Sequence, residues 1–519
     1  MSPLNNVKHA GADPAVLVVG AGPTGLALAV DLARRGVPAL LLERNAALFP
    51  GSRGKGLQPR TLEVLDDLGV VDAVLAAGGP YPPMLGWDGD RPLGAYEMVA
   101  RPTGPVPGVP YPEGRMLPQW RTQRVLYERL RALGGDVRFG AGLADLAQDA
   151  HGVTARLDDG TSVRARWLVA ADGGRSTVRA LLGVDMTGGA VSDTHVLVAD
   201  ARVDGMSRDH WHVWADAPGG AVACCPLAGT DQFQIVARYG DGARPDTSPA
   251  GVRRLVAERT PFAASAVRDV GWVSAFRPRA ALADRFRDGR VLLAGDAAHL
   301  HTPDGGQGLN TSVQDAYNLG WKLATALADG VAAADAEALV DSYERERRPV
   351  AEDVIGLSTR LHRAAEAGRP EGRRRGRETH QLDLGYRDGP LSRDTRRAPG
   401  GTLRAGDRAP DAECALADGA RVRLFDAFRG PHWTLLAVGG APLPPLPPPP
   451  GGGPLPVRAY AVTPTEPHAH AAYGTGPALY LVRPDGYVGL ATDDPAEVAA
   501  YARRYAPPYA SAPASAPAR

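Results

Sequence analysis

Three glycines near the start of the chain, Gly20, Gly22 and Gly25, follow an apolar run and precede a helical pattern. In this spacing the first glycine permits a tight turn, the second lets a pyrophosphate approach the backbone, and the third allows close helix–strand packing. A helix starting near Pro23 would offer its free N–H groups to the phosphates. Glu43, eighteen residues after Gly25, ends the next expected strand, where a carboxylate accepts hydrogen bonds from ribose hydroxyls. The segment predicts a dinucleotide site that disfavours the 2′-phosphate of NADP.

Two later motifs indicate which dinucleotide binds. Asp172 ends a strand expected over 167–171 and precedes a helix that opens at Ser176. Asp296 follows the strand that starts at Val291 in the same way. Carboxyl ends of parallel strands meet at one edge of a sheet, so these side chains are expected near the glycine turn. An aspartate there can bind ribityl hydroxyls, which FAD has and NAD lacks, so non-covalent FAD is the predicted cofactor.

The glycine-rich stretch 305–310 leads into a long helix expected from Asn310 to Ala328. Its positive end would meet the N1–C2=O edge of a flavin, which carries negative charge in the reduced ring. His299 and His301 are candidate metal ligands or bases. Because no third ligand lies near them in the sequence, no metal site is expected.

The elements that must position these residues predict an α/β fold. A strand–turn–helix–strand unit spans 15–43, and alternating apolar runs between about 190 and 280 indicate a sheet with one covered face. The expected architecture is a Rossmann-like FAD-binding domain with an inserted mixed-sheet substrate domain and a smaller C-terminal domain. The predicted boundaries are a flexible arm at 1–13, an FAD-binding domain at 14–80, 119–190 and 281–400, a substrate-binding sheet at 81–118 and 191–280, a C-terminal domain at 401–507 and a disordered tail at 508–519.

The composition excludes several classes of protein. The 519 residues carry 58 basic and 58 acidic side chains, so no bulk charge favours nucleic acid or a membrane surface. Lys8, Lys55 and Lys322 are the only lysines; the other basic residues are arginines. Three cysteines cannot build a disulfide framework, and no apolar run reaches the roughly 18–20 residues of a membrane span. With no signal-peptide pattern at the N-terminus, a cytoplasmic protein is expected.

Three motifs, at 20–25, 172–179 and 295–315, match a known family in order and spacing. The chain resembles class A flavoprotein aromatic monooxygenases of the para-hydroxybenzoate hydroxylase fold, especially bacterial hydroxylases of polyketide and antibiotic aromatics. The resemblance implies NAD(P)H as transient reductant, O₂ as co-substrate and oxygen transfer to a (poly)cyclic phenol through a flavin C4a-hydroperoxide. It also implies that the C-terminal domain is thioredoxin-like, although Cys414 stands alone and no Cys-x-x-Cys is present.

The resemblance adds further cofactor contacts to those inferred from the motifs. The full predicted cofactor-binding set is Gly20, Gly22, Pro23, Thr24, Gly25, Glu43, Arg44, Arg53, Gln119, Gln123, Asp172, Asp296, Pro303, Gly306, Gly308, Leu309 and Asn310. Arg53 is also the one candidate catalytic residue, as a charge that senses the ring or the nicotinamide; a plain pyrophosphate contact is the alternative. Many relatives carry a small or apolar residue where Asp304 stands, and we expect its carboxylate to face solvent, with a place near the ring as the alternative.

Other functions on the same scaffold remain open from the sequence. A flavin halogenase is disfavoured because its Trp-x-Trp-x-Ile-Pro signature is missing: Trp211 and Trp214 are spaced differently. A Baeyer–Villiger or ring-opening oxygenase differs only in substrate and in peroxide protonation. A non-catalytic FAD-binding protein is the third alternative. The substrate, its base and the oligomeric state are not assigned.

Overall fold

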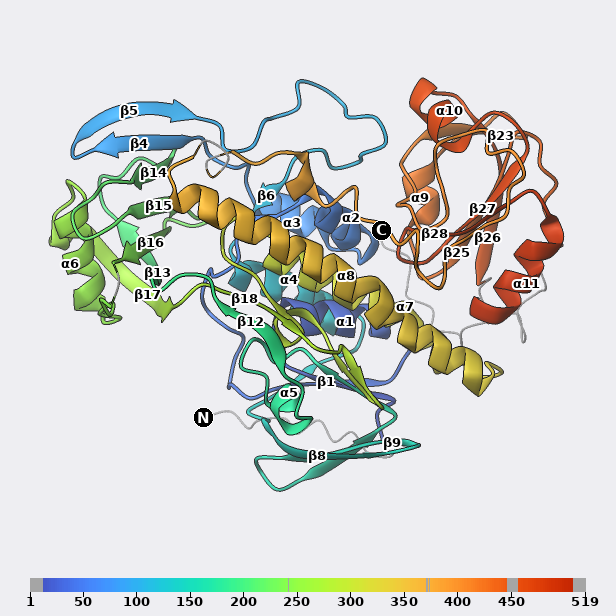
Figure 1. Cartoon of the computed structure of the whole chain (residues 1–519), viewed down its shortest axis with the longest axis horizontal. Coiled ribbons are helices and arrows are strands. Elements are labelled where there is room, and N and C mark those ends of the chain that lie inside the picture. The colour runs from blue at the N-terminus through green and yellow to red at the C-terminus, as the bar shows by residue number, and fades with distance from the viewer. Residues whose placement is uncertain (1–12, 241, 370–371, 373, 446–455, 507–519) are drawn as a thin grey trace.

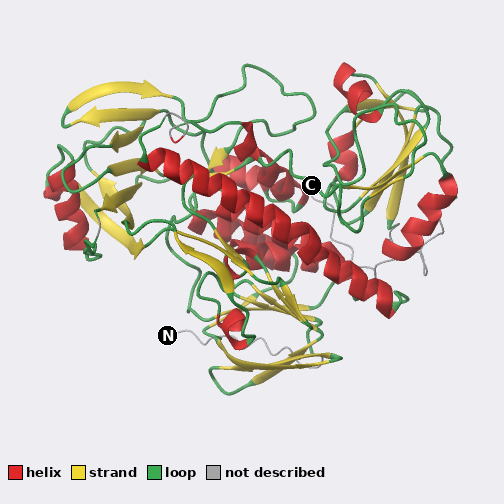
Figure 2. Ribbon diagram, in the orientation of Figure 1, coloured by secondary structure: helices red, strands yellow, loops and turns green. Residues whose placement is uncertain are grey.

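The protein is described from a computed structural model that covers residues 13–240, 242–369, 372, 374–445 and 456–506. All but the last residue of the predicted N-terminal arm lies outside this range, as does the whole predicted tail. Figure 2 shows strands gathered into separate sheets around a central group of helices. The α/β fold class is confirmed.

A six-stranded sheet holds the nucleotide-binding motifs. Its order is β19 (Arg287–Asp288), β20 (Val291–Leu293), β11 (Trp167–Ala170), β1 (Val16–Val19), β2 (Ala39–Glu43) and β7 (Val137–Phe139). Every pairing is parallel except that of β19. The strands β1, β11 and β20 are fully buried apolar runs, as expected for a parallel sheet covered on both faces. The β1, β11 and β20 ends therefore lie side by side, as the motifs require.

Helices form the layer beside this sheet. α1 (Pro23–Arg34) packs against α4 (Gln119–Ala132) and α7 (Gly308–Ala326), near α2 (Pro59–Asp67) and α3 (Val71–Ala77). Gly320 permits the close approach of α7 to α1, because a Cβ there would lie 2.1 Å from Asp31 Oδ2. The short α5 is Thr177–Leu181. The 34-residue α8 (Ala333–Glu366) runs across the molecule beside α7 (Figure 1) and was not predicted from the sequence.

A mixed seven-stranded sheet forms the inserted domain. Its order is β17 (Val267–Phe276), β13 (His195–Val203), β16 (Phe233–Tyr239), β15 (Val222–Pro226), β14 (Trp211–Trp214), β4 (Met84–Asp88) and β5 (Arg91–Tyr96). Only β14 and β4 pair in parallel. One face packs on α6 (Pro249–Arg259) through Leu197, Ile235, Val252 and their neighbours. The opposite face is directed at the FAD-binding domain, as the contacts below show.

Smaller sheets connect these parts. β12 (Met186–Ala190), β18 (Arg279–Ala283) and β21 (His299–Leu300) form one three-stranded sheet, and β8 (Leu143–Asp149), β9 (Gly152–Leu157) and β10 (Ser162–Ala165) form another. β3 (Gly56–Leu57) pairs with β6 (Arg115–Met116). The β3 segment connects the nucleotide site with the seven-stranded sheet.

The C-terminal region is a second seven-stranded sheet. Its order is β22 (Arg393–Asp394), β28 (Val488–Thr492), β27 (Ala478–Val482), β25 (Trp433–Val438), β26 (Val457–Pro464), β23 (Glu413–Leu416) and β24 (Arg421–Arg423), with helices α9 (Leu424–Phe428), α10 (Pro467–Tyr473) and α11 (Pro495–Tyr505). Trp321 of α7 packs edge-on against Trp433, with ring centroids 5.4 Å apart. Cys414 is buried, which raises its thiol pKa to about 11. The thioredoxin-like assignment stays a prediction. No helix in the described part of the chain has the length and apolarity to cross a membrane.

Candidate functional site

The glycine turn after β1 has the geometry of a phosphate cradle. Gly20 has φ +104°, and a Cβ there would lie 2.4 Å from the Ala171 carbonyl oxygen. A Cβ at Gly25 would lie 1.9 Å from the carbonyl oxygen of Gly20, so backbone packing forbids a side chain at both positions. A Cβ at Gly22 would meet nothing within 4 Å. The second glycine therefore faces open space, where a pyrophosphate could approach the start of α1.

Glu43 lies beside this turn. Its Oε2 accepts a hydrogen bond from the Ala21 amide at 3.0 Å, and its Oε1 accepts from the Asn45 amide at 2.9 Å. A carboxylate has about four acceptor positions, so Glu43 can hold the turn and still accept bonds from a ribose. The neighbouring Arg44 is exposed.

Asp172 and Asp296 end adjacent strands but have different partners. Asp172 Oδ2 accepts hydrogen bonds from the Thr177 and Val178 amides at 2.7 and 3.2 Å and so caps α5. Its Oδ1 is buried and has no partner in the described structure. Burial raises the pKa of the Asp172 carboxyl, and the hydrogen bonds oppose the rise. One oxygen of Asp172 thus builds the fold, and the other remains available.

Asp296 keeps both carboxylate oxygens available. It is accessible to solvent, although protein atoms around it raise its pKa by desolvation, while the nearby His299 and Arg53 act to lower it. The preceding Gly295 has φ +61°, and a Cβ there would lie 2.5 Å from the Thr24 hydroxyl oxygen. The Gly-Asp turn therefore closes directly onto the first glycine turn. This contact joins motifs about 270 residues apart in the sequence.

The loop before α7 is held by Asn310. Its Oδ1 accepts from the Gln58 amide at 2.8 Å, and its Nδ2 donates to the Gly56 and Gly306 carbonyls at 2.9 and 2.8 Å. Pro303 and Gly306 remain exposed, and Gly308 and Leu309 form the first turn of the helix. The positive end of a buried 19-residue helix thus opens onto the same edge of the sheet as Asp296.

Gln119 and Gln123 position the loop that carries Arg53. Gln119 Oε1 accepts from the Gly54 amide at 3.0 Å, and Gln119 Nε2 donates to Gln123 Oε1 at 3.0 Å. The fully buried Gln123 donates in turn to the Phe49 carbonyl at 3.3 Å. The Arg53 guanidinium is exposed and lies 5.4 Å from the centroid of the Phe49 ring. In this structure the two glutamines therefore support the backbone around Arg53.

The expectation that Asp304 faces solvent is wrong. Its side chain is only 14% exposed and forms a hydrogen bond with His362 Nδ1 at 2.6 Å and an ion pair with Arg238 at 3.2 Å. Burial acts to raise the pKa of Asp304, but the hydrogen bond from His362 and the charge of Arg238 lower it overall. Asp304 ties the loop before α7 to α8 and to the seven-stranded sheet. The sequence could not show this, because both partners are far away in the chain.

The two histidines after Asp296 belong to a buried row of hydrogen bonds. Arg347 Nε donates to Asp315 Oδ1 at 2.7 Å, Asp315 Oδ2 pairs with His299 Nε2 at 2.6 Å, and His299 Nδ1 meets His301 Nε2 at 2.9 Å. Desolvation and the neighbouring His299 lower the pKa of His301. The sequence marked Asp315 only as the end of the third motif, without a role, and did not indicate Arg347. Within the described ranges, no group of three or more His, Cys, Asp or Glu side chains could hold a metal.

On the face of the seven-stranded sheet opposite α6, the side chains change from polar to apolar along the strands. Asp200, Gln234 and Cys225 form a cross-strand row that contacts the 51–55 loop: Ser52 donates from its amide to Asp200 Oδ2 at 2.8 Å and accepts from Gln234 Nε2 at 2.8 Å on its hydroxyl. Two residues further along each strand, every side chain is either small or apolar: the row, called the apolar strip below, consists of Gly86, Val213, Ala223, Val236, Val198 and Ser274. All but Val198 are partly exposed. The apolar strip therefore shares its sheet face with Gln234, which bonds to Ser52, and with Arg238, which pairs with Asp304 in the loop before α7.

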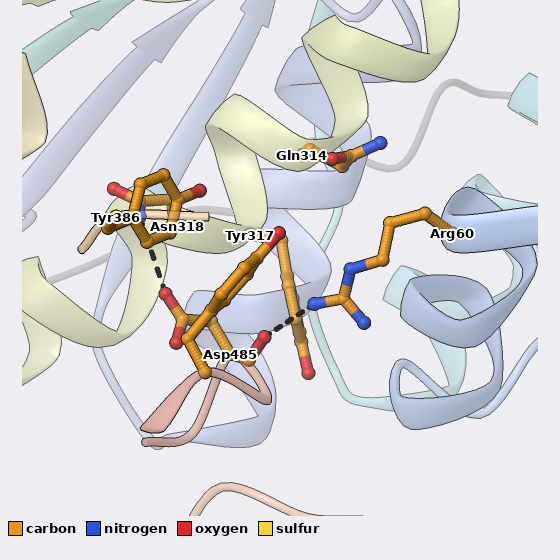
Figure 3. A pocket seen from close by; sticks show the side chains of 7 residues that line it. Arg60, Gln314, Tyr317, Asn318, Tyr386 and Asp485 are labelled. Atoms are coloured by element: carbon orange, nitrogen blue, oxygen red, sulfur yellow. Dashed lines mark hydrogen bonds between the residues drawn. The ribbon is translucent and has the colours of Figure 1, made fainter. Parts of the chain in front are cut away.

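A small polar pocket lies elsewhere, between α2, α7 and the β27–β28 turn (Figure 3). It is lined by Arg60, Gln314, Tyr317, Asn318, Tyr386, Asp485 and Tyr487, whose side chains leave no room for a water molecule between them. Pockets for drug-sized ligands measure roughly 300–1,000 Å³. It is too small for a flavin and contains none of the predicted cofactor-binding residues.

The residues at the sheet edge fit FAD. An open glycine turn suits a pyrophosphate, an accessible carboxylate suits ribityl hydroxyls, and a helix N-terminus suits the electron-rich edge of the ring. The apolar strip opposite would accept a flat substrate. Fold and site together define a protein of the FAD-binding class.

Comparison with known proteins gives the same class. Residues 13–358 match the family model for the FAD-binding domain, and residues 402–506 match the aromatic-ring hydroxylase C-terminal domain. A flavin-dependent monooxygenase of Mycobacteroides abscessus is 42% identical over 501 residues, covering 94% of this chain and 99% of the relative. A 12-dehydrotetracycline 5-monooxygenase/anhydrotetracycline 6-monooxygenase of Streptomyces rimosus is 34% identical over 461 residues, covering 82% of this chain and 85% of the relative.

Solved structures resemble the whole chain as well. Aklavinone-11 hydroxylase in complex with FAD and aklavinone matches with a TM-score of 0.76 and 29% identity over 96% of this chain and 99% of that one. The chain belongs to the family of FAD-dependent aromatic-ring hydroxylases. It is accordingly a flavin-dependent monooxygenase with FAD as its cofactor, which rules out the non-catalytic alternative.

Proposed function

We propose that this enzyme uses NAD(P)H and O₂ to hydroxylate a (poly)cyclic phenolic compound of the aromatic polyketide type. The observation that carries the proposal is the apolar strip of Gly86, Val213, Ala223, Val236, Val198 and Ser274, on the sheet face that Arg238 ties to the loop before α7. Small and β-branched side chains on a sheet offer a flat surface, which suits a planar ring system.

The cofactor assignment follows from the geometry of the sheet edge. Gly20, Gly22, Pro23, Thr24, Gly25 and Glu43 would hold the adenosine diphosphate part, Asp296 the ribityl chain, and Pro303, Gly306, Gly308, Leu309 and Asn310 the ring. Arg44, Arg53, Gln119, Gln123 and Asp172 complete the set, the glutamines through the loop that they support. Bound FAD supplies the redox chemistry that carries electrons from NAD(P)H to O₂.

The rest of the chain supplies positioning and exclusion of water. The seven-stranded sheet covers the loop before α7, and Arg238 on β16 ties it to Asp304. Keeping water from the reacting centre favours transfer of oxygen to substrate over loss of the oxidant. Arg53 lies on the accessible side of this site, near Trp272 and Ser274, and we assign it the charge that meets the ring or the nicotinamide.

Relatives support the substrate class. The names of two of them specify tetracycline intermediates and aklavinone, which are polycyclic aromatic compounds with phenolic oxygens. A reducing, cytoplasmic setting belongs to the same proposal, because Cys224, Cys225 and Cys414 are all free thiols.

The test is to reconstitute the purified protein with FAD and follow NADH and NADPH oxidation with and without a panel of polycyclic phenols. We expect at least one compound to stimulate oxidation and to gain one oxygen atom, as a hydroxyl group on a ring, by mass spectrometry and NMR. Insertion of that oxygen into a ring C–C bond would replace hydroxylation with Baeyer–Villiger chemistry. Oxidation that yields only hydrogen peroxide across the panel would contradict the proposed substrate class.

A further inference from the structure

Lys55 places a positive charge between the seven-stranded sheet and the loop before α7. Its Nζ donates a hydrogen bond to Gln234 Oε1 and lies 4.3 Å from the centroid of the Trp211 ring. No carboxylate of the described residues approaches this ammonium within 4.0 Å. An ammonium has three donors, so the recorded contacts leave donor capacity for a ligand.

The position of Lys55 connects it to the proposed ring site. A Cβ on the preceding Gly54 would lie 2.9 Å from Leu309 Cδ1, and the carbonyl of the following Gly56 accepts from Asn310 Nδ2 at 2.9 Å. The Lys55 side chain leaves this segment toward β14 and β16, where Trp211 is two residues from Val213 of the apolar strip. The ammonium is therefore at the border of the surface that we assign to the substrate.

The nearest acidic groups balance the charge of Lys55 only in part. Asp200 lies within electrostatic reach, but the Ser52 amide and hydroxyl both donate to its carboxylate. Cys225 also faces Lys55, and burial raises the pKa of its thiol to about 11, which keeps it neutral near pH 7. Desolvation lowers the pKa of Lys55 itself, and Cys225 and Asp200 partly oppose that shift. A desolvated cation without a close counter-ion favours an anionic ligand.

The choice of lysine over arginine at position 55 indicates the chemical class of the ligand. Fifty-five of the 58 basic residues are arginine, and the position facing the strip is one of three lysines. Arginine presents a planar fork that matches carboxylates and phosphates, whereas lysine presents a compact point charge. The face of the Trp211 ring attracts cations and so holds the ammonium in place. A compact positive charge held there suits a single ionised oxygen at the edge of a flat molecule.

We propose that Lys55, seated on Trp211, binds an ionised phenolic or enolic oxygen of the substrate and thereby selects ring systems that carry an acidic hydroxyl at that edge. Lys55 acts as a specificity-determining residue: it stabilises the anion and orients the ring on the strip. The inference rests on the proposed function for the place of the substrate, but it concerns binding and not turnover.

The test uses the FAD-reconstituted full chain and 1,2-dihydroxyanthraquinone, a flat probe whose absorbance shifts when a phenol ionises. Titrations compare the wild type with Lys55→Met, Lys55→Arg and, as a control for loss of one exposed cation, Arg91→Met on β5. We expect the wild type and Arg91→Met to bind the probe as the phenolate and to lower its apparent pKa by about one unit or more. Lys55→Met should bind at least tenfold more weakly and lose the phenolate spectrum, with Lys55→Arg in between.

Control measurements distinguish a failure of the Lys55 inference from a failure of the proposed function. FAD affinity and the thermal midpoint should be unchanged in Lys55→Met, which excludes a general defect of the site. Because Asp200 and Cys225 face Lys55 and Arg208 lies beyond the thiol, the pH titration is repeated in Cys225→Ser and should give the same phenolate shift. Binding of the neutral phenol by the wild type, absence of binding, or an ionised spectrum that survives in Lys55→Met would each overturn the inference. Substrate-stimulated NAD(P)H oxidation in the same preparations would show that the proposed function stands even then.

Discussion

Two charged regions of this molecule differ in how fully their charges are paired. Where α7, α8 and the β27–β28 turn meet, Glu346 accepts from Arg483 at 2.7 Å on one oxygen and from Lys322 at 2.7 Å on the other. Asp485 closes the cluster by accepting from Arg483 and from the Trp321 indole at 2.9 and 3.0 Å. At the sheet edge that we assign to FAD, Asp296 has no such partners among the described residues.

The difference separates structural charges from binding charges. A buried charge with every partner in place fixes one arrangement of its elements, and removing one partner leaves the others uncompensated. A carboxylate without protein partners adds little to folding and keeps its hydrogen-bonding capacity for a ligand. Loss of Glu346 should therefore reduce stability, and loss of Asp296 should reduce binding. The predictions below test that separation, from the largest effect to the smallest.

Glu346→Ala should produce the largest loss of stability. It leaves the Arg483 guanidinium and the Lys322 ammonium buried without their shared carboxylate, which costs about 3–5 kcal/mol. Denaturant unfolding of the apo protein measures the loss. Asp341→Ala, an exposed carboxylate on the same helix, is the matched control and should change stability by about 0–1 kcal/mol. Equal losses in the two variants would contradict the structural role of the cluster.

The same cluster should make the protein sensitive to acid. Burial acts to raise the pKa of Glu346, but Arg483 and Lys322 lower it to about 2 from its ordinary 4.5. Because the folded-state pKa is depressed, the stabilisation is present above pH 4.5 and is lost as the pH falls toward 2, by about 3 kcal/mol in all. The gap in unfolding free energy between the wild type and Glu346→Gln should narrow across this interval. A gap that is constant with pH would mean that Glu346 does not titrate as its contacts imply.

Asp296→Ala should have the opposite effects: unchanged stability and weaker FAD binding. The apo protein should unfold at the wild-type denaturant concentration within error, because no described hydrogen bond is lost. FAD binding should weaken by about 1.5–3 kcal/mol for each hydrogen bond to the charged carboxylate. Fluorescence titration with FAD measures the dissociation constant. A variant purified with full flavin absorbance would remove Asp296 from the site.

Glu43→Ala should weaken FAD by about 1.5–3 kcal/mol, since a single carboxylate meets the ribose. Its structural contacts to Ala21 and Asn45 are also lost, so a modest fall in apo stability should accompany the change. Titration with FAD and with adenosine monophosphate separates the adenosine contact from effects on the ring. If the variant bound each of the two ligands as tightly as the wild type does, the ribose contact would be disproved.

Lys322→Met should have the smallest effect. Burial outweighs the attraction of Glu346 and lowers the pKa of Lys322 to about 8, so its charge is held at a cost. Glu346 keeps Arg483 and Asn318 as partners, and methionine matches the volume of the lost side chain. The change in unfolding free energy should stay under about 1.5 kcal/mol. A loss as large as that of Glu346→Ala would show that Lys322 and not Arg483 dominates the cluster.

Local motifs were predictable from the sequence because the residues that determine each of them lie within one short segment. The glycine turn, Glu43 and the Gly-Asp pair each combine a backbone requirement with a side chain a few residues away, and the parallel sheet brings them to one edge. The site assignments themselves remain predictions. Contacts between distant segments were not predictable: Asp304 meets Arg238 and His362, and Lys55 meets Gln234.

Two further features could not be predicted from short segments of sequence: which side chains of a strand face the site, and the longest helix. In the seven-stranded sheet, Trp211 lies against Lys55, whereas Trp214 and Phe233 belong to the core on the α6 side. Parity depends on the register of pairing, which no single strand reveals. The helix α8 contains Pro349 and many charges, and its buried stripe alternates with exposed residues over 34 positions. Its polar members find partners only in other segments, as Glu346 does in Arg483.

Helix α7 has a consequence for the order in which a ribosome completes this protein. Its first turn frames the proposed ring site, while Asn318, Trp321 and Lys322 further along it are bonded within the cluster that contains Arg483 and Asp485. Those last two residues are synthesised more than 150 positions after α7 ends. Until they leave the exit tunnel, the nascent chain holds Glu346 paired with Lys322 but without the guanidinium of Arg483. Packing of the second half of α7 thus depends on a segment that is translated after the whole of the FAD-binding fold.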